Sequence, residues 1–209
     1  MTSALGLAAA CFILMAFGCF LYLRGESYGF LRPKAILAIK GGTTLLAAFL
    51  AFYGFLQSGL PAHFLISVGI AVCAAADVVL NLRFKLGMLV FALGHICYIS
   101  AFVIGGGIHP LNVIIYFIFI MVILLLSGKL KNHLSQAAAP FLAYSFIIAA
   151  MFSLALTQPL LAALGALLFV LSDSLLFLRF VMTPKPGHHA AVMSAYYLAQ
   201  FFLALSLMF

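Results

Sequence analysis

The chain has 209 residues, of which 67% are hydrophobic and 6% are charged. Soluble domains are about half apolar and a quarter charged, so this composition excludes a soluble protein and predicts an integral membrane protein. The net charge of +7 comes from bases in short loops beside apolar segments. Such bases form no surface that tracks phosphates, so binding to nucleic acid is not expected.

Apolar runs bounded by charge, proline or glycine predict eight membrane-spanning helices. A spanning helix needs about 20 apolar residues, so eight of them with short connections use up the whole chain. We expect the spans at residues 3–23, 34–56, 62–82, 86–105, 110–127, 138–156, 159–180 and 188–208. The predicted fold is therefore an all-α integral membrane bundle with a single domain, residues 1–209.

Lysine and arginine concentrate in alternate connections between these spans. Nine of the ten bases lie on one side of the predicted bundle: Arg24, Arg32, Lys34, Arg83, Lys85, Lys129, Lys131, Arg179 and Lys185. The positive-inside rule makes that side cytoplasmic, which places both termini outside the cytoplasm. In a bacterium, the membrane would be the inner (cytoplasmic) membrane.

One pattern, Asp-x-x-Leu-x-Leu-Arg-Phe, occurs at the end of the third span, Asp77 to Phe84, and again at the end of the seventh, Asp173 to Phe180. A recurrence after four helices predicts two parallel half-repeats, at about residues 1–105 and 106–209. Chance recurrence of leucine-rich sequence in an apolar protein is the alternative.

Asp77 and Asp173 are, besides Glu26, the only acidic residues of the chain. Each precedes its arginine by six residues, which places it about 9 Å inside the cytoplasmic end of its helix. An ionisable group inside a span marks a function by default, although each aspartate could instead pair with a buried base or with a local polar network. If their helices approach, a low dielectric and mutual repulsion would leave one protonated acid beside one carboxylate, which is the arrangement of general acid–base hydrolysis.

Two further polar residues lie near the depth of the aspartates. Asn81 is one turn beyond Asp77 and shares its helix face, so it could orient a carboxyl group or a substrate hydroxyl. Lys40 in the second span either snorkels to the interface or faces the site, where it would hold a lipid phosphate or balance the carboxylates. Ser172 and Ser174 flank Asp173 and could serve either the site or helix packing.

The fourth and eighth spans carry a polar patch each. His95 lies in mid-span with Tyr98 nearly one turn on, and Tyr196, Tyr197 and Gln200 form the second patch. Packing and interhelical hydrogen bonds are the alternative roles for these side chains. His188 and His189 are expected to be solvated. The cysteines show no CxxC spacing, so we expect free thiols at Cys11, Cys19, Cys73 and Cys97. No cluster has metal-ligand spacing, so we expect neither a metal nor a cofactor.

Several blocks of this sequence together resemble the lysoplasmalogenase (YhhN-like) membrane family. The blocks are Asp77-Val-Val-Leu with Gly94-His95-Ile-Cys-Tyr98, then Ser172-Asp173-Ser174 with Tyr196-Tyr197-Leu-Ala-Gln200, and weaker marks at Lys40, Tyr144 and Met151. The resemblance implies an eight-helix hydrolase that cleaves the vinyl ether bond of lysoplasmalogens, which are lysophospholipids within a membrane. The products are a fatty aldehyde and glycerophosphoethanolamine or glycerophosphocholine.

That reaction suits two carboxyl groups, because protonation of a vinyl ether at carbon gives an oxocarbenium-like cation, as in glycosidases. We expect one of Asp77 and Asp173 to donate the proton, while the other stabilises the cation and activates water. Candidates for binding the water and the substrate are Lys40 for the phosphate, together with Asn81, His95, Tyr98, Tyr197 and Gln200.

The sequence also leaves other functions open. A proton-coupled transporter of small solutes also has parallel repeats and acids within its spans. An intramembrane aspartyl protease needs two aspartates as well, but the expected Gly-x-Gly-Asp context is absent, since Ala74-Ala75-Ala76 precedes Asp77. A structural membrane protein without activity is the last alternative. The sequence leaves the oligomeric state open.

Overall fold

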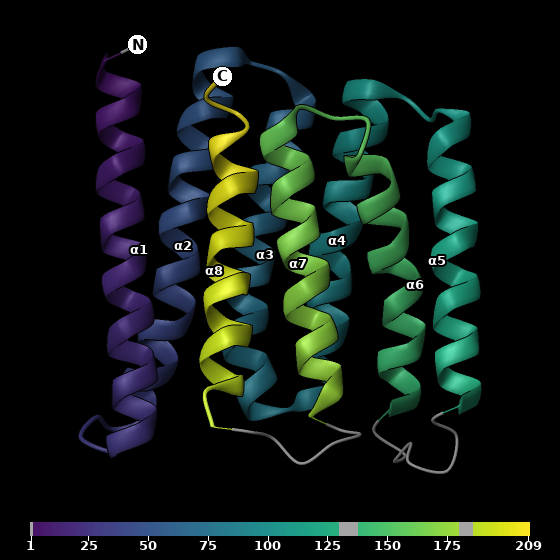
Figure 1. Cartoon of the computed structure of the whole chain (residues 1–209). Coiled ribbons are helices and arrows are strands. Elements are labelled where there is room, and N and C mark those ends of the chain that lie inside the picture. Colours follow the sequence, from purple (N-terminus) through teal and green to yellow (C-terminus); the bar gives the residue numbers. More distant parts are fainter. Residues whose placement is uncertain (1, 130–137, 180–185) are drawn as a thin grey trace.

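The computed structural model of the chain describes residues 2–129, 138–179 and 186–209, which are helical apart from short connections. These residues form eight helices (Figure 1): α1 (Thr2–Tyr28), α2 (Pro33–Ser58), α3 (Pro61–Leu82), α4 (Phe84–Gly106), α5 (Pro110–Lys129), α6 (Ala138–Ala155), α7 (Leu160–Leu178) and α8 (His188–Leu205). Helices that follow one another along the chain run in opposite directions. The prediction of an all-α membrane protein is confirmed.

Proline and glycine determine several helix ends. Pro33 and Pro61 stand in the first turn of α2 and α3, where the missing N–H would have no partner within the helix. At the end of α2, Gly59 has a φ of 67°, and its N–H donates to the carbonyl of Phe55 at 2.7 Å. These local signals explain why the predicted helix ends lie within three residues of the observed ones, except at the end of α1.

The first helix is longer than predicted, because it continues past the charged residues that ended the predicted span at residue 23. The Arg24 guanidinium lies 5.3 Å from the ring centroids of both Phe20 and Tyr28, and it donates to the Tyr28 hydroxyl at 3.0 Å. Contacts four residues apart stabilise a helix. The charge therefore ends the apolar run without ending the helix.

Six of the described helices are long and apolar enough to cross a membrane, namely α1, α2, α3, α4, α5 and α7. The apolar part of α6 is shorter, Pro140–Ala155. Polar side chains such as His188, His189 and Gln200 reduce the hydropathy of α8. The chain is thus a multi-pass integral membrane protein, and the count of eight spans stays a prediction.

The neighbours of each helix follow one scheme in both halves of the chain. α1 packs on α2, α2 on α3 and α3 on α4; four helices later, α5 packs on α6, α6 on α7 and α7 on α8. Each half also reaches the other in a corresponding way, through α4 with α6 and α8 with α2. These relations agree with the parallel repeat, which stays a prediction.

One departure from this scheme concerns the two helices at the edges of the bundle (Figure 1). α1 packs on both α2 and α8, whereas α5 packs on α6 alone among the described helices. Much of the α5 surface is accordingly exposed and apolar, including Phe117, Met121, Leu124 and Leu125. In a multi-pass membrane protein such a surface faces lipid.

Both termini lie at one end of the bundle (Figure 1), and described bases gather at the other end: Arg24, Arg32, Lys34, Arg83, Lys85 and Arg179. Lys131, His133, Phe180 and Lys185 lie outside the described residues. This distribution has the asymmetry from which the orientation in the membrane was predicted, and the orientation itself stays a prediction.

Candidate functional site

Asp77 on α3 is held in a closed polar cluster. Its Oδ2 accepts hydrogen bonds from the Thr44 hydroxyl on α2 at 2.6 Å and from the Tyr196 hydroxyl on α8 at 2.9 Å. Its Oδ1 lies 3.9 Å from the Nζ of Lys40, also on α2. The residue is 1% exposed. An ammonium and two hydroxyl donors together stabilise this side chain as a carboxylate.

Lys40 turns inward, toward Asp77, and is buried. Besides its ion pair it donates to Asn81 Oδ1 at 3.1 Å, and its own carbonyl accepts a hydrogen bond from the Tyr197 hydroxyl at 3.3 Å. Its Nζ lies 5.9 Å from the ring centroid of Tyr22 on α1. Lys40 thus connects Asn81 and Tyr197 to Asp77. The predicted contacts of these three residues with substrate stay predictions.

A glycine allows α2 to approach α3 beside this cluster. A Cβ at Gly41 would lie 3.0 Å from Val78 Cγ2 and 3.1 Å from the Ala74 carbonyl oxygen, which is closer than ordinary contact. A Cβ at the neighbouring Gly42 would meet nothing within 4 Å. Gly41 therefore sets the spacing that brings Lys40 to Asp77.

Asp173 on α7 has fewer partners than Asp77. Its Oδ2 accepts a hydrogen bond from the Tyr144 hydroxyl on α6 at 2.9 Å, and no cation pairs with it among the described residues. Ser172 donates to the carbonyl of Val192 at 3.0 Å, so it joins α7 to α8 and does not contact the carboxyl group. With a single neutral donor, Asp173 is less stabilised as an anion than Asp77.

The wall of an apolar crevice includes Asp173. The crevice lies between α5, α6 and α7, has a volume of about 310 Å³, and is lined mainly by Phe119, Val122, Ile123, Leu126, Phe141, Leu142, Ile148, Val170, Phe177 and Leu178. The hydroxyls of Ser127 and Ser145 also line it, but each donates to a carbonyl of its own helix, at 2.6 and 2.8 Å. Asp173 is 9% exposed, so a molecule in the crevice can contact it.

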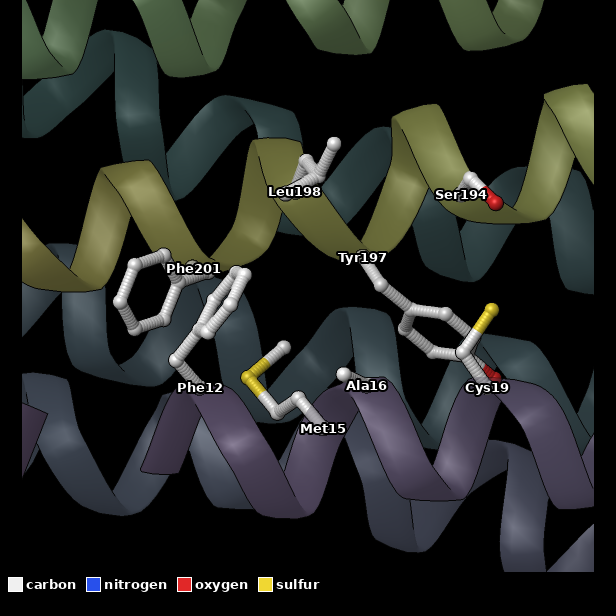
Figure 2. A pocket seen from close by; sticks show the side chains of 8 residues that line it. All are labelled: Phe12, Met15, Ala16, Cys19, Ser194, Tyr197, Leu198 and Phe201. Atoms are coloured by element: carbon white, nitrogen blue, oxygen red, sulfur yellow. The ribbon is translucent and has the colours of Figure 1, made fainter. Parts of the chain in front are cut away.

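A second apolar groove lies between α1 and α8 and has a volume of about 240 Å³. Figure 2 shows its lining, with Phe12 and Met15 of α1 opposite Tyr197 and Phe201 of α8. Neither aspartate belongs to this lining. The crevice and this groove are both lined mainly by apolar side chains, but the crevice is the one whose wall includes a carboxyl group.

His95, Tyr98 and Gln200 lie in the middle of the bundle and are fully buried. The Nδ1 of His95 is 2.9 Å from the Phe91 carbonyl and 3.5 Å from the Tyr144 hydroxyl. The Tyr98 hydroxyl donates to Gln200 Oε1 at 2.9 Å. Because the Tyr144 hydroxyl also donates to Asp173, Tyr144 links His95 to that carboxyl group.

Aromatic side chains connect the surroundings of the two aspartates. Tyr196, which donates to Asp77, packs edge-on against Phe169 with the centroids 5.5 Å apart. Phe169 packs against His95 at 4.5 Å, and His95 packs against Tyr144 at 5.4 Å. Among the described residues no hydrogen bond joins the two carboxyl groups directly. Their predicted joint action in catalysis stays a prediction.

Thr44 and Tyr144 are contacts of the aspartates that the sequence did not single out for the site. Thr44 stands one turn after Lys40 on the same face of α2, a spacing that could have indicated it. Tyr144 was marked only by family resemblance. Tyrosine in an apolar helix is common, so nothing local indicates that its hydroxyl binds Asp173.

Histidines at the basic end of the bundle are less solvated than expected. His189 Nε2 lies 2.6 Å from Glu26 Oε2, and His188 Nε2 donates to the carbonyl of Leu175 at 2.7 Å. Both are half-buried, because α1 and α7 pack close to the start of α8. In the part of the chain that the structure describes, no three histidine, cysteine or acidic side chains are placed to hold a metal ion.

Comparison with known proteins gives a family match over most of the chain. Residues 35–207 match the YhhN family. Lysoplasmalogenase TMEM86B of Homo sapiens is 34% identical over 142 residues, which are 66% of this chain and 61% of the relative. Lysoplasmalogenase TMEM86B of Sus scrofa is 33% identical over the same shares. Lysoplasmalogenase TMEM86A of Bos taurus is 34% identical over 174 residues, or 70% of this chain and 66% of the relative.

The matched part of the chain spans about three fifths of the human and porcine relatives. No solved structure matches this chain significantly.

Proposed function

The chain belongs to the YhhN family, and we propose that it is a membrane hydrolase that cleaves the vinyl ether bond of lysoplasmalogens. The products would be a fatty aldehyde and a glycerophospho-headgroup. The names of the relatives support this activity, since all three are lysoplasmalogenases. They favour it over proton-coupled transport of a small solute.

The observation that carries the proposal is the position of Asp173 on the wall of the crevice between α5, α6 and α7. A lysoplasmalogen has one aliphatic tail, which begins at the vinyl ether bond. A tail in this apolar crevice would place the carbons of that bond beside a carboxyl group. Because α5 packs on α6 alone among the described helices, a tail can reach the crevice from the lipid.

Hydrolysis of a vinyl ether begins with a proton transfer to carbon, which creates a cation on the carbon next to oxygen. Glycosidases meet a similar cation with one protonated and one ionised carboxyl group. Such a division of roles requires two carboxyl groups in unequal environments.

The two aspartates have such unequal environments, and we assign their roles accordingly. Asp173, with one neutral donor and an apolar wall, is the acid that protonates the substrate carbon. Asp77, with Lys40 and two hydroxyl donors, is the carboxylate whose negative charge stabilises the cation. Lys40 then balances the charge of Asp77, a role that suits its position better than holding a lipid phosphate.

Release of aldehyde from purified protein in detergent tests this function. Lysoplasmenylethanolamine is the substrate, and its saturated ether analogue is the negative control, because it has no double bond to protonate. Loss of a general acid lowers a rate by about 10²–10⁴-fold, so Asp173→Asn should release aldehyde more slowly by that factor. Asp77→Asn should also release aldehyde more slowly, because the cation loses its counter-charge.

Glu26→Gln is the matched control, since Glu26 is the remaining acidic residue and lies at the surface, paired with His189. It should release aldehyde at the wild-type rate. Wild-type rates in both aspartate variants would refute the assigned roles. Proton-dependent solute uptake into proteoliposomes without lipid turnover would instead support a transporter.

A further inference from the structure

His95 is held in one tautomer by its surroundings. Its Nδ1 lies 2.9 Å from the carbonyl oxygen of Phe91, which can only accept a hydrogen bond. Nδ1 therefore carries the hydrogen. Tyr144, 3.5 Å from the same nitrogen, directs its own hydrogen to Asp173. The Nε2 of a neutral His95 thus presents a lone pair.

This Nε2 has no hydrogen-bond partner among the described residues, although the ring is fully buried. Tyr144, Tyr98 and Phe169 enclose the ring, with centroid distances of 5.4, 5.7 and 4.5 Å. Buried polar atoms nearly always have a partner, and an unpaired one at a functional site calls for an explanation. The free lone pair of Nε2 can accept a hydrogen bond from a water molecule.

A second buried polar atom without a described partner belongs to Gln200. Its Oε1 accepts the hydrogen of Tyr98, so its Nε2 is left as a free donor. Tyr98 contacts both residues, since its ring packs on His95 and its hydroxyl binds Gln200. An acceptor and a donor together can hold one water molecule, which needs two to four polar partners when buried.

We propose that His95 is a catalytic base, whose Nε2 takes the proton from the water that adds to the substrate cation, and that Gln200 orients this water. The inference rests on the proposed function, and it gives the activation of water to His95 and not to the second aspartate.

The protons balance over the reaction in three steps. Asp173 first gives its proton to the vinyl carbon. The water oxygen then bonds to the cationic carbon, and a water O–H bond breaks and its proton goes to Nε2, which leaves a hemiacetal and an imidazolium. Finally the hemiacetal carbon–oxygen bond to glycerol breaks, Nε2–H protonates the leaving glycerol oxygen, and the hemiacetal hydroxyl returns its proton to Asp173. One water is consumed, and both residues regain their starting states.

The acid and the ring that carries the base share a contact, Tyr144. Tyr144 lies between them, with its hydroxyl 2.9 Å from Asp173 Oδ2 and 3.5 Å from His95 Nδ1. The same phenol therefore fixes the position of the acid and of the ring that carries the base. Glycosidases likewise use one group as an acid in one step and as a base in the next.

Two substitutions separate the base from the structural role of the ring. His95→Asn keeps a side-chain nitrogen near the Nδ1 position, where it can still donate to Phe91, and removes the base. His95→Gln places an amide oxygen near the Nε2 position, where it can accept a hydrogen bond from water but cannot take its proton. If one variant does not fold, the other still decides the question. His109→Asn, at the exposed connection before α5, is the control.

In both His95 variants kcat for aldehyde release should fall about 10²–10⁴-fold while KM stays near the wild-type value. Added imidazole should restore kcat in a saturable manner in the His95 variants, and more basic imidazoles should restore it further. Imidazole should not restore Asp173→Asn. A structural role would not respond to added base.

Wild-type kcat in either His95 variant would overturn the inference, and so would a loss that imidazole restores in neither. These failures differ from failure of the proposed function. If the wild-type protein releases no aldehyde, the function is wrong; if it does and the His95 variants do equally, only the role of His95 is wrong.

Discussion

Tyr196 on α8 donates a hydrogen bond to Asp77 on α3 at 2.9 Å, and so ties the last helix of the chain to the third. Thr44 on α2 donates to the same oxygen. Three helices thus meet at one carboxyl group. Removing one donor should weaken this junction without abolishing it, because the other donor remains.

Tyr196→Phe should therefore lower the stability of the protein by about 0.6 kcal/mol, the average for hydrogen bonds between membrane helices, and by no more than about 1.7 kcal/mol, their maximum. Thermal unfolding in detergent measures the change. Tyr53→Phe is the matched control, since no hydrogen bond of its hydroxyl occurs among the described residues, and its stability should not change. Equal unfolding midpoints for the two variants would contradict the importance of this bond.

Replacing Lys40 should lower the stability more than replacing Tyr196, because Lys40 is the buried cation beside Asp77. Lys40→Met should lower the stability by about 3–5 kcal/mol, since it leaves a buried carboxylate without its counter-charge. Adding Asp77→Asn should recover much of this loss, because the uncompensated charge is then gone. The four proteins form a double-mutant cycle, measured by unfolding in denaturant.

The surface variant Lys34→Met is the control for that cycle, and it should change the stability by no more than about 0.5 kcal/mol. Independent, additive effects of Lys40→Met and Asp77→Asn would show that the two side chains do not interact.

Adjacent glycines on α2 should respond in opposite directions to the same substitution. Gly42→Ala places its methyl group in open space and should stabilise the helix by about 0.5–1 kcal/mol. Gly41→Ala pushes against Val78 and the Ala74 carbonyl, so it should destabilise the protein by about 1–3 kcal/mol and lower aldehyde release by moving Lys40 from Asp77. Shifts of the unfolding midpoint in the same direction for both variants would contradict this account of how closely α2 approaches α3.

The sequence was sufficient for those parts of the fold that depend on local signals. Prolines such as Pro33 and Pro61 begin helices after a turn, and the apolar runs between them are long. The acids were recognisable for a similar reason, because Asp77 and Asp173 are rare residues in apolar helices.

The partners of those acids depend on packing between distant helices, which no local pattern encodes. Tyr196 and Asp77 are 119 residues apart, and neither the choice between snorkelling and inward positions for Lys40 nor the role of Tyr144 follows from spacing. The repeated motif left open which of the two aspartates is the acid. Their environments differ because α1 closes one side of the bundle while α5 leaves the other side open.

This open side leads to the last prediction, which concerns the length of the substrate tail. Ser145 lines the crevice beside Asp173, and its hydroxyl binds its own helix, so Ser145→Leu narrows the crevice without leaving a polar atom unpaired. The relative kcat/KM for long-tailed over short-tailed lysoplasmenyl substrates should fall about tenfold or more, as expected for steric exclusion of a few methylenes.

Ser194→Leu makes the same substitution in the groove between α1 and α8 (Figure 2) and should leave the dependence on tail length unchanged. The measurement is kcat/KM over a series of tail lengths for the wild type and both variants. A shift in tail preference in Ser194→Leu, with none in Ser145→Leu, would move the tail to the α1–α8 groove. It would also separate the reacting bond from Asp173 and so contradict the assignment of that residue as the acid.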